Sequence, residues 1–223
     1  LRESIARYAA DTDVLLLTGP QGSGHEAAAR AVHHQSPRSS HAFIHVNCAM
    51  FPPGQDPGIV STPAAASEST ASVRLSLLDL ATHGTLYLEE IQRLPEGLQE
   101  RLADVLEDIE AARERGEPVS RERGKPAPRD IRVIAFSSAP LAPASGFLPK
   151  LLTLLERRQL RVPSLAERPD DVAEIALFFL SQHARRIGSV VETISEQSMK
   201  RLRRYRWPGD VTELQSVIER AVT

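Results

Sequence analysis

The glycine-rich segment at residues 19–24, Gly-Pro-Gln-Gly-Ser-Gly, constrains the fold more than any other part of the chain. It follows a compact apolar run at residues 14–17 and precedes an alanine-rich stretch at residues 26–34 that favours a helix. A buried parallel strand that enters a tight turn and then a helix explains all three features. The segment therefore predicts a strand–turn–helix unit of the α/β class.

The rest of the chain continues this alternation and then changes to helices alone. Further strands are expected at residues 41–46, 85–90, 131–136 and 160–162, and helices at 1–10, 73–81, 98–109 and 148–156. Later helices are expected at 171–186, 195–205 and 210–222, with Ser195 and Asp210 as candidate N-caps. Loops are expected at 52–70 and 113–129. This order predicts an α/β domain, a parallel sheet flanked by helices, over residues 1–165 and a small all-helical subdomain over residues 166–223.

The glycine-rich segment also has the spacing of a P-loop. In such a loop the glycines let backbone N–H groups surround phosphates, and the N-terminus of the next helix adds positive potential. The residue after the last glycine is normally a lysine that reaches the outer phosphates, but here it is His25, which is shorter and mostly neutral at pH 7. The same glycines also fit a plain tight turn. The candidate phosphate-binding residues are Gly19, Gly22, Ser23, Gly24, His25 and Glu26.

An apolar strand that ends in the acids Glu89 and Glu90 has the Walker B arrangement. In that arrangement the first acid holds Mg²⁺ and the second polarises the attacking water. The first acid is normally Asp, and the extra methylene of Glu89 displaces its carboxylate by about 1.5 Å. Mg²⁺ tolerates such displacement badly. A solvated strand end is the plainer alternative.

The segment Trp-Pro-Gly-Asp-Val-Thr-Glu-Leu at residues 207–214 resembles the WPGNVREL signature of the AAA+ domain of sigma-54-dependent transcription activators. Other segments then match the same family in order: 19–26 resembles GESGTGKE, 46–49 VNCA, 84–91 GTLFLDEI, 131–135 VRVIA and 163–168 PPLRER. The resemblance covers nearly the whole chain. It implies a AAA+ P-loop fold with a helical lid, and ATP-driven remodelling of sigma-54 RNA polymerase by a ring of subunits.

The sequence departs from this family at most positions that carry the chemistry. Besides His25 and Glu89, the departures are Ser138 at the sensor position, Leu148 and Leu154 where arginines would reach a neighbour's nucleotide, and Thr212 where the lid arginine is expected. Arg157 and Arg158 lie nearby but out of register. An arginine finger contributes about 10³ to 10⁵ in rate in related enzymes. Residues 51–70 also lack the GAFTGA loop that contacts sigma-54. We therefore expect negligible ATP turnover and no working catalytic residues.

The resemblance and its departures together favour a AAA+-like module of a bacterial transcription regulator that acts as a non-hydrolysing scaffold or signal transmitter. One alternative is a nucleotide sensor that binds ATP, ADP or a cyclic dinucleotide without hydrolysing it. In that case the only cofactor expected is ATP or ADP, bound weakly. Arg2, Arg157, Arg158 and Arg161 are its candidate basic ligands. Another alternative is a weak ATPase that uses His25 and Glu90.

Composition limits the partners. The formal net charge is -2, which does not call for nucleic acid, so no direct DNA contact is expected. Cys48 is the chain's single cysteine, so it forms no intrachain disulfide, no metal site is expected, and a reducing cytoplasm fits. No apolar stretch suggests a membrane span. The expected partners are other domains of a longer regulator, namely an N-terminal sensor and a C-terminal DNA-binding domain, together with RNA polymerase and further copies of the chain.

Overall fold

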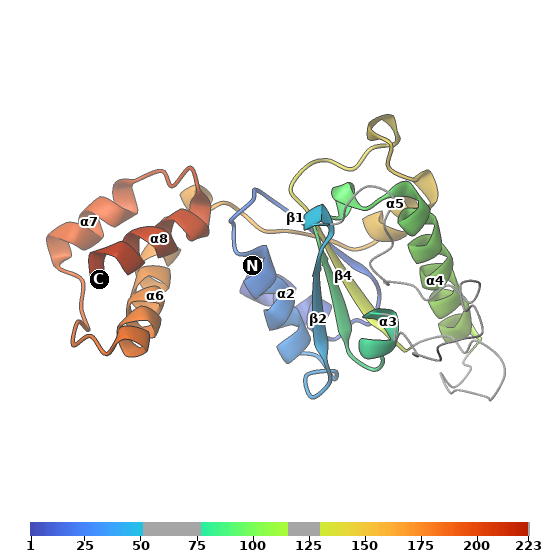
Figure 1. Cartoon of the computed structure of the whole chain (residues 1–223), viewed down its shortest axis with the longest axis horizontal. Helices are drawn as coiled ribbons and strands as arrows, with labels where there is room; N and C mark the ends of the chain where they lie inside the picture. The colour runs from blue at the N-terminus through green and yellow to red at the C-terminus, as the bar shows by residue number, and fades with distance from the viewer. Residues whose placement is uncertain (51–76, 116–129, 223) are drawn as a thin grey trace, which may run out of the picture. The chain divides into compact units, whose positions relative to one another are not determined.

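The computed structural model describes residues 1–50, 77–115 and 130–222. Within these residues five strands form one parallel sheet in the order β2-β3-β4-β1-β5 (Figure 1). The strands are β1 (Leu15–Thr18), β2 (Phe43–Asn47), β3 (Thr85–Glu89), β4 (Arg132–Ser137) and β5 (Gln159–Arg161). The expected α/β fold with a parallel sheet is confirmed.

Helices fill the connections between the strands and the whole of the C-terminal part. They are α1 (Arg2–Ala9), α2 (His25–His34), α3 (Leu77–Leu80), α4 (Glu96–Glu114), α5 (Pro149–Glu156), α6 (Asp171–Ile187), α7 (Glu196–Arg204) and α8 (Asp210–Val222). Helix α4 is longer at both ends than the predicted 98–109. The predicted loop at 52–70, and residues 73–76 of the helix predicted at 73–81, lie outside the described residues, and α3 forms within the rest of that prediction. No helix among the described residues is long and apolar enough to cross a membrane.

Alternation along the strands divides the sheet into two faces. Leu86 and Leu88 of β3, with Val133 and Ala135 of β4, belong to a buried core that includes apolar residues of α4 and α5. The residues between them face the other way. There Tyr87 of β3 stacks on Phe43 of β2, and α2 covers this side of the sheet (Figure 1). Both faces are therefore buried, as the near-continuous apolar runs of the strands predict.

The chain forms two compact units that are not continuous in sequence. The sheet unit comprises Leu1–Thr18 and Glu26–Leu160, and the lid unit comprises Gly19–His25 and Arg161–Thr223. The lid unit packs α6, α7 and α8 around a core that contains Trp207 and Leu214. The predicted boundary between 1–165 and 166–223 stays a prediction, but by contacts the glycine-rich segment groups with the helices.

Two predicted helix starts have different local structures. Ser195 caps α7, since its Oγ accepts a hydrogen bond from the Ser198 N–H at 3.3 Å. Asp210 is the first residue of α8, and its buried carboxylate accepts hydrogen bonds from the N–H groups of Val211 (3.0 Å) and Leu165 (2.9 Å). Asp210 therefore holds the start of α8 against the segment that leads out of β5.

Candidate functional site

The predicted site residues fall in both units, and each group is built locally. The glycine loop, residues 19–24, belongs to the lid unit. Its backbone needs glycine, because Gly22 and Gly24 have φ of 81° and 88°, a region that other residues rarely adopt. A Cβ on Gly22 would lie 2.9 Å from the Gly209 carbonyl oxygen, so the loop also approaches the start of α8 closely. The structure thus confirms a tight, glycine-dependent loop.

Backbone and side-chain hydrogen bonds hold the glycine loop to the lid helices. The Val211 N–H donates to the Gly22 carbonyl oxygen at 3.0 Å, and Arg168 Nη2 donates to the Ser23 carbonyl oxygen at 2.5 Å. Thr212, at the position expected for the lid arginine, has its Oγ1 3.1 Å from the place a Gly22 Cβ would occupy. A short hydroxyl side chain therefore borders the loop where a long cation was expected.

Two side chains of this segment are buried. Ser23 is 0% exposed, and its Oγ has no hydrogen-bond partner among the described residues. His25, the first residue of α2, is 6% exposed. An imidazole enclosed in this way cannot extend toward phosphates as a lysine does. The side chain of Glu26, the next residue, is 42% exposed, and it pairs with Arg30 one turn along α2 at 2.8 Å.

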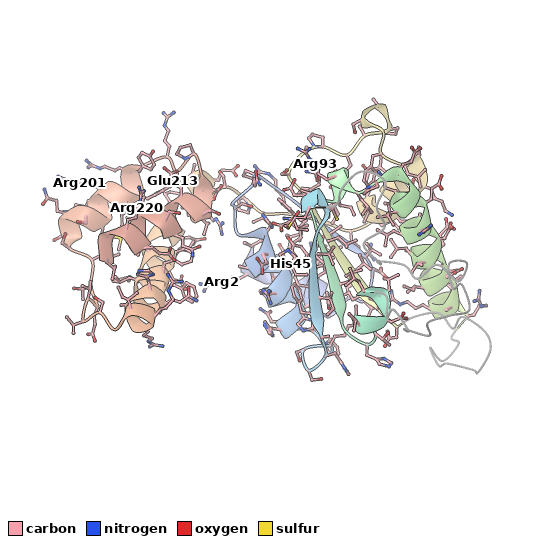
Figure 2. The ribbon with its side chains drawn as sticks, viewed as in Figure 1. Arg2, His45, Arg93, Arg201, Glu213 and Arg220 are labelled. Carbon is pink, nitrogen blue, oxygen red and sulfur yellow. The ribbon has the colours of Figure 1, made fainter. Side chains whose placement is uncertain are left out.

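In the sheet unit, Glu89 at the end of β3 is bound by two residues of the neighbouring strand. Its Oε2 accepts a hydrogen bond from Asn47 Nδ2 at 3.0 Å and lies 3.0 Å from His45 Nε2. The register places Asn47 beside Glu89, and His45 two residues earlier on the same face, the face covered by α2 (Figure 2). Sequence reasoning missed both partners: alternation in β2 indicates that they share a face, but not that they lie beside Glu89.

The second acid, Glu90, lies just beyond β3 in a left-handed conformation (φ 55°, ψ 49°) and is 8% exposed. Its Oε2 accepts hydrogen bonds from Ser138 Oγ, at 2.7 Å, and from Gln92 Nε2, while Oε1 is buried and has no hydrogen-bond partner in the described part of the chain. Ser137 Oγ in turn donates to Gln92 Oε1 at 2.8 Å. The structure therefore brings the predicted residues Glu90 and Ser138 together, through a small network in which Gln92 and Ser137 were not foreseen.

Burial and the two acids raise the pKa values of two neighbouring side chains at this end of the sheet. Burial, with smaller contributions from Glu89 and Glu90, raises the pKa of the Cys48 thiol to about 12. Burial and the same carboxylates raise the pKa of Tyr87 above its ordinary value. Neither group ionises near neutral pH, so neither is a nucleophile or a general base here.

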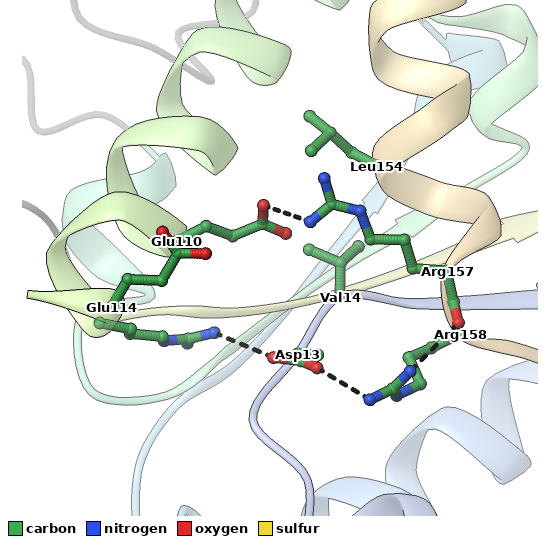
Figure 3. A pocket seen from close by; sticks show the side chains of 8 residues that line it. Asp13, Val14, Glu110, Glu114, Leu154, Arg157 and Arg158 are labelled. Carbon is green, nitrogen blue, oxygen red and sulfur yellow. Dashed lines mark hydrogen bonds and ion pairs between the residues drawn. The ribbon is translucent and has the colours of Figure 1, made fainter.

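Three of the four arginines predicted as candidate ligands form ion pairs within the protein. Arg157 Nη1 lies 2.5 Å from Glu110 Oε2, and Arg158 pairs with Asp11 at 3.1 Å and Asp13 at 3.4 Å. Arg157, Arg158, Glu110 and Asp13 line a pocket of about 250 Å³ in the sheet unit (Figure 3). Arg161, in the lid unit, binds Glu167 at 2.7 Å, and Arg2 lies at the exposed start of α1 (Figure 2).

The two leucines at the positions expected for arginines belong to the core of the sheet unit. Leu154 is buried among residues of α4 and the sheet, and Leu148 packs partly buried against the same cluster. At both positions the apolar side chain packs against apolar neighbours. Neither position carries a charged or polar side-chain group.

Comparison with known proteins places these features in a family. Residues 1–145 match the family described as Sigma-54 interaction domain, and residues 166–223 match the one described as AAA+ ATPase lid domain. The transcriptional regulatory protein FlbD of Caulobacter vibrioides is 35% identical over 213 residues, which cover 93% of this chain and 45% of FlbD. The DNA-binding transcriptional activator HyfR of Escherichia coli is 30% identical over 226 residues, 100% of this chain and 33% of HyfR.

Solved structures agree with this placement. NtrX from Brucella abortus in complex with ADP superimposes with a TM-score of 0.79 at 28% identity, covering 98% of this chain and 47% of NtrX. The same protein in complex with ATP gives a TM-score of 0.78 at 29% identity, covering 98% of this chain and 49% of NtrX. The chain thus spans about a third to a half of the length of these relatives.

Proposed function

This chain belongs to the Sigma-54 interaction domain family, and from that premise we propose that it is a AAA+-like regulatory module that does not hydrolyse ATP. The observation that carries the proposal is the state of the two acids at the end of β3. Their carboxylates are bound by neighbouring side chains of the protein, and the glycine loop has no lysine to hold the phosphates.

Glu90 is poorly placed to polarise water. One of its oxygens accepts two hydrogen bonds and the other is buried, so neither is open to a water molecule. A general base must come within hydrogen-bond reach of the proton that it takes. Glu89 fits a Mg²⁺ ion no better, since its Oε2 is held by Asn47 and lies beside His45. These contacts favour a structural role for both acids.

The charge that builds up as a terminal phosphate leaves also lacks counter-ions. Positioned cations supply most of the stabilisation in phosphoryl transfer. Here His25 is buried, Thr212 is a short neutral side chain, and Leu154 belongs to the core. Within this proposal the module holds other domains of its regulator together, a sensor before it and a DNA-binding domain after it, or transmits signals between them. RNA polymerase and further copies of the chain are the remaining proposed partners.

An ATP turnover assay tests the proposal. We expect the purified chain to release no inorganic phosphate above a protein-free control, and the His25→Lys variant to remain equally inactive because the other departures persist. Glu90→Gln serves as the matched control, since contaminating ATPases do not respond to it. Phosphate release that rises with protein concentration and disappears in Glu90→Gln would overturn the proposal and favour the weak ATPase.

A second candidate function, nucleotide binding without hydrolysis, is favoured by the glycine loop. The left-handed glycines keep the backbone shape that surrounds phosphates, and the buried Ser23 hydroxyl lacks a protein partner. NtrX, at 28% and 29% identity, was crystallised in complex with ADP and with ATP. The residues present thus fit the phosphates of a nucleotide through backbone groups, although they fit Mg²⁺ poorly.

Titration calorimetry with ATP, ADP and cyclic di-GMP tests this candidate. We expect measurable binding of ADP or ATP, tightened about tenfold by His25→Lys, because a cation adds a charge-assisted hydrogen bond to phosphate. His25→Gln, which adds no charge, should leave the affinity nearly unchanged. The absence of heat with all three ligands, for both the natural chain and His25→Lys, would remove nucleotide binding.

A further inference from the structure

Helix α7 and the turn after it carry a dense group of exposed cations. We call this group the α7 basic cluster, and its members are Lys200, Arg201, Arg203, Arg204 and Arg206. It lies in the lid unit, far along the sequence from the glycine loop and the acids of β3. The proposed function above makes no use of it.

Most of these cations have no partner within the part of the chain that the structure describes. Lys200 pairs with Glu196 one turn earlier at 2.7 Å, but the four arginines make no side-chain hydrogen bond or ion pair there. Two other acids of the lid unit have partners outside the cluster. Glu213 accepts from the Gly209 N–H at 2.9 Å, and Glu219 pairs with Arg186 at 3.7 Å. The cluster therefore keeps its positive charge on the surface.

Helix stability does not explain so many cations. Arginines in the last turn interact favourably with the helix dipole, by about 0.3–1 kcal/mol each. Like charges three or four residues apart, such as Lys200 with Arg203 and Arg201 with Arg204, oppose this by about 0.2–0.5 kcal/mol per pair. The repulsion offsets part of the favourable interaction, so helix stability gains little from the later additions to the cluster, and the exposed charge is available to a partner outside the chain.

The inner side of α7 is already used by the fold. Leu202 packs against the lid core, and Trp207 Nε1 donates a hydrogen bond to the Leu202 carbonyl oxygen at 2.9 Å. Arg201 points away from the helices (Figure 2), and the Tyr205 ring is 51% exposed. A fixed helix thus presents guanidinium groups and one aromatic ring to solvent.

We propose that the α7 basic cluster binds the phosphodiester backbone of DNA without sequence preference. Guanidinium groups bind phosphate oxygens through paired hydrogen bonds, and clustered arginines on one helix are the footprint of such binding. An anionic membrane fits less well, because a helix that binds lipid inserts its apolar side, whereas that side of α7 packs in the lid. The relative HyfR is described as a DNA-binding transcriptional activator, so DNA is a polyanion that at least one relative binds.

This proposal revises the expectation of no direct DNA contact. That expectation used the net charge of the whole chain, -2, which averages over the surface. Phosphates respond to the local field within about 10 Å, the Debye length at ordinary ionic strength. The density of positive charge on α7, rather than the net charge of the whole chain, is therefore the quantity that bears on DNA binding.

The proposal is tested on the 223-residue chain by fluorescence anisotropy. The chain is titrated into a labelled duplex of about 20 base pairs at NaCl concentrations between about 50 and 200 mM. With about three to five phosphates contacted, the slope of log affinity against log salt should be about −3 to −4.5. The double variant Arg201→Gln, Arg204→Gln should lose about tenfold or more in affinity at low salt, and its slope should become shallower by about 2.

Two matched variants separate this contact from general charge effects. Arg201→Lys with Arg204→Lys keeps the charge and should retain most of the affinity. Arg7→Gln with Arg93→Gln removes two exposed arginines of the sheet unit, of which Figure 2 labels Arg93, and should change nothing. Circular dichroism checks that each variant is folded. Absence of binding at low salt, an equal loss in the Arg7, Arg93 control, or tighter binding to polyglutamate or to phosphatidylserine vesicles than to DNA would each overturn the proposal.

Discussion

Replacing Gly84 with alanine is expected to lower the free energy of unfolding by about 3 kcal/mol or more, because the new methyl group overlaps the backbone of Ala42, the residue just before β2. A Cβ at this position would lie 2.1 Å from the Ala42 carbonyl oxygen. That oxygen accepts the Thr85 N–H at 2.9 Å, and the Gly84 carbonyl oxygen accepts the Arg132 N–H at 3.1 Å. Neither side can move without breaking the hydrogen bonds at the start of β2, β3 and β4.

Gly97 provides the matched control for this substitution. It lies in the first turn of α4, and nothing would come within 4 Å of a Cβ there. Gly97→Ala should therefore stabilise the protein, by about 0.5–1 kcal/mol, since alanine loses less entropy in a helix. Urea unfolding followed by far-ultraviolet circular dichroism measures both. A Gly84→Ala variant as stable as Gly97→Ala would show that the close approach of β2 and β3 is not a structural constraint.

Replacing Asp210 with alanine is expected to destabilise the lid unit by about 3 kcal/mol. The change leaves the N–H group of Leu165 without its acceptor, at about 1–3 kcal/mol for a buried group, whereas the Val211 N–H keeps the Gly22 carbonyl oxygen. Asp210 also has a φ of 57°, a left-handed conformation that costs alanine about 1 kcal/mol more. The single tryptophan, Trp207, belongs to the lid core, so its fluorescence during urea unfolding reports on this unit.

Asp210→Asn is the informative companion, because the amide oxygen can accept the same two hydrogen bonds without a buried charge. Burial raises the pKa of Asp210, although the hydrogen bonds from Leu165 and Val211 act in the opposite direction. The folded state therefore binds the proton more tightly than the unfolded state, and the stability that this group contributes falls as pH rises from 3.8 to the raised value.

The asparagine variant does not titrate at this position. It should be more stable than the natural protein at about pH 7, by an amount that shrinks as the pH falls toward the ordinary value of aspartate. The comparison requires Trp207 fluorescence during urea unfolding at neutral and at acidic pH. An asparagine variant as unstable as Asp210→Ala, or an advantage that does not change with pH, would contradict this account of the buried carboxylate.

The sequence was sufficient for the sheet because its strands are buried on both faces. Apolar runs such as residues 14–17 and 131–136 are long enough to identify, and β1 and β4 form at these places. Boundaries were less well predicted. The connection was predicted to begin at residue 113, yet α4 continues to Glu114, and near this end Glu110 and Arg113 pair with Arg157 and Asp13, which are distant in the sequence. Partners that are distant in sequence leave no local pattern.

The same limit applies to the candidate site. Family resemblance located Glu89, Glu90 and Ser138, and the meeting of Glu90 with Ser138 follows from the adjacency of β3 and β4. The contacts of Glu89 with His45 and Asn47 depend on strand register, which alternation alone does not set. The burial of His25 was likewise beyond the sequence, since its surroundings come from the tertiary structure.

The assignment of Gly19–His25 to the lid unit has a consequence for how this chain can be divided. A fragment that starts at residue 166 would carry α8 but not the Gly22 carbonyl oxygen that the Val211 N–H contacts. Grafting the last third of a relative onto the first two thirds of this chain would combine a glycine loop and a helix α8 from two different proteins, whose contacting residues are not matched to each other. Chimeric proteins should therefore exchange the loop and the C-terminal helices as a pair, although about 135 residues of sequence separate them.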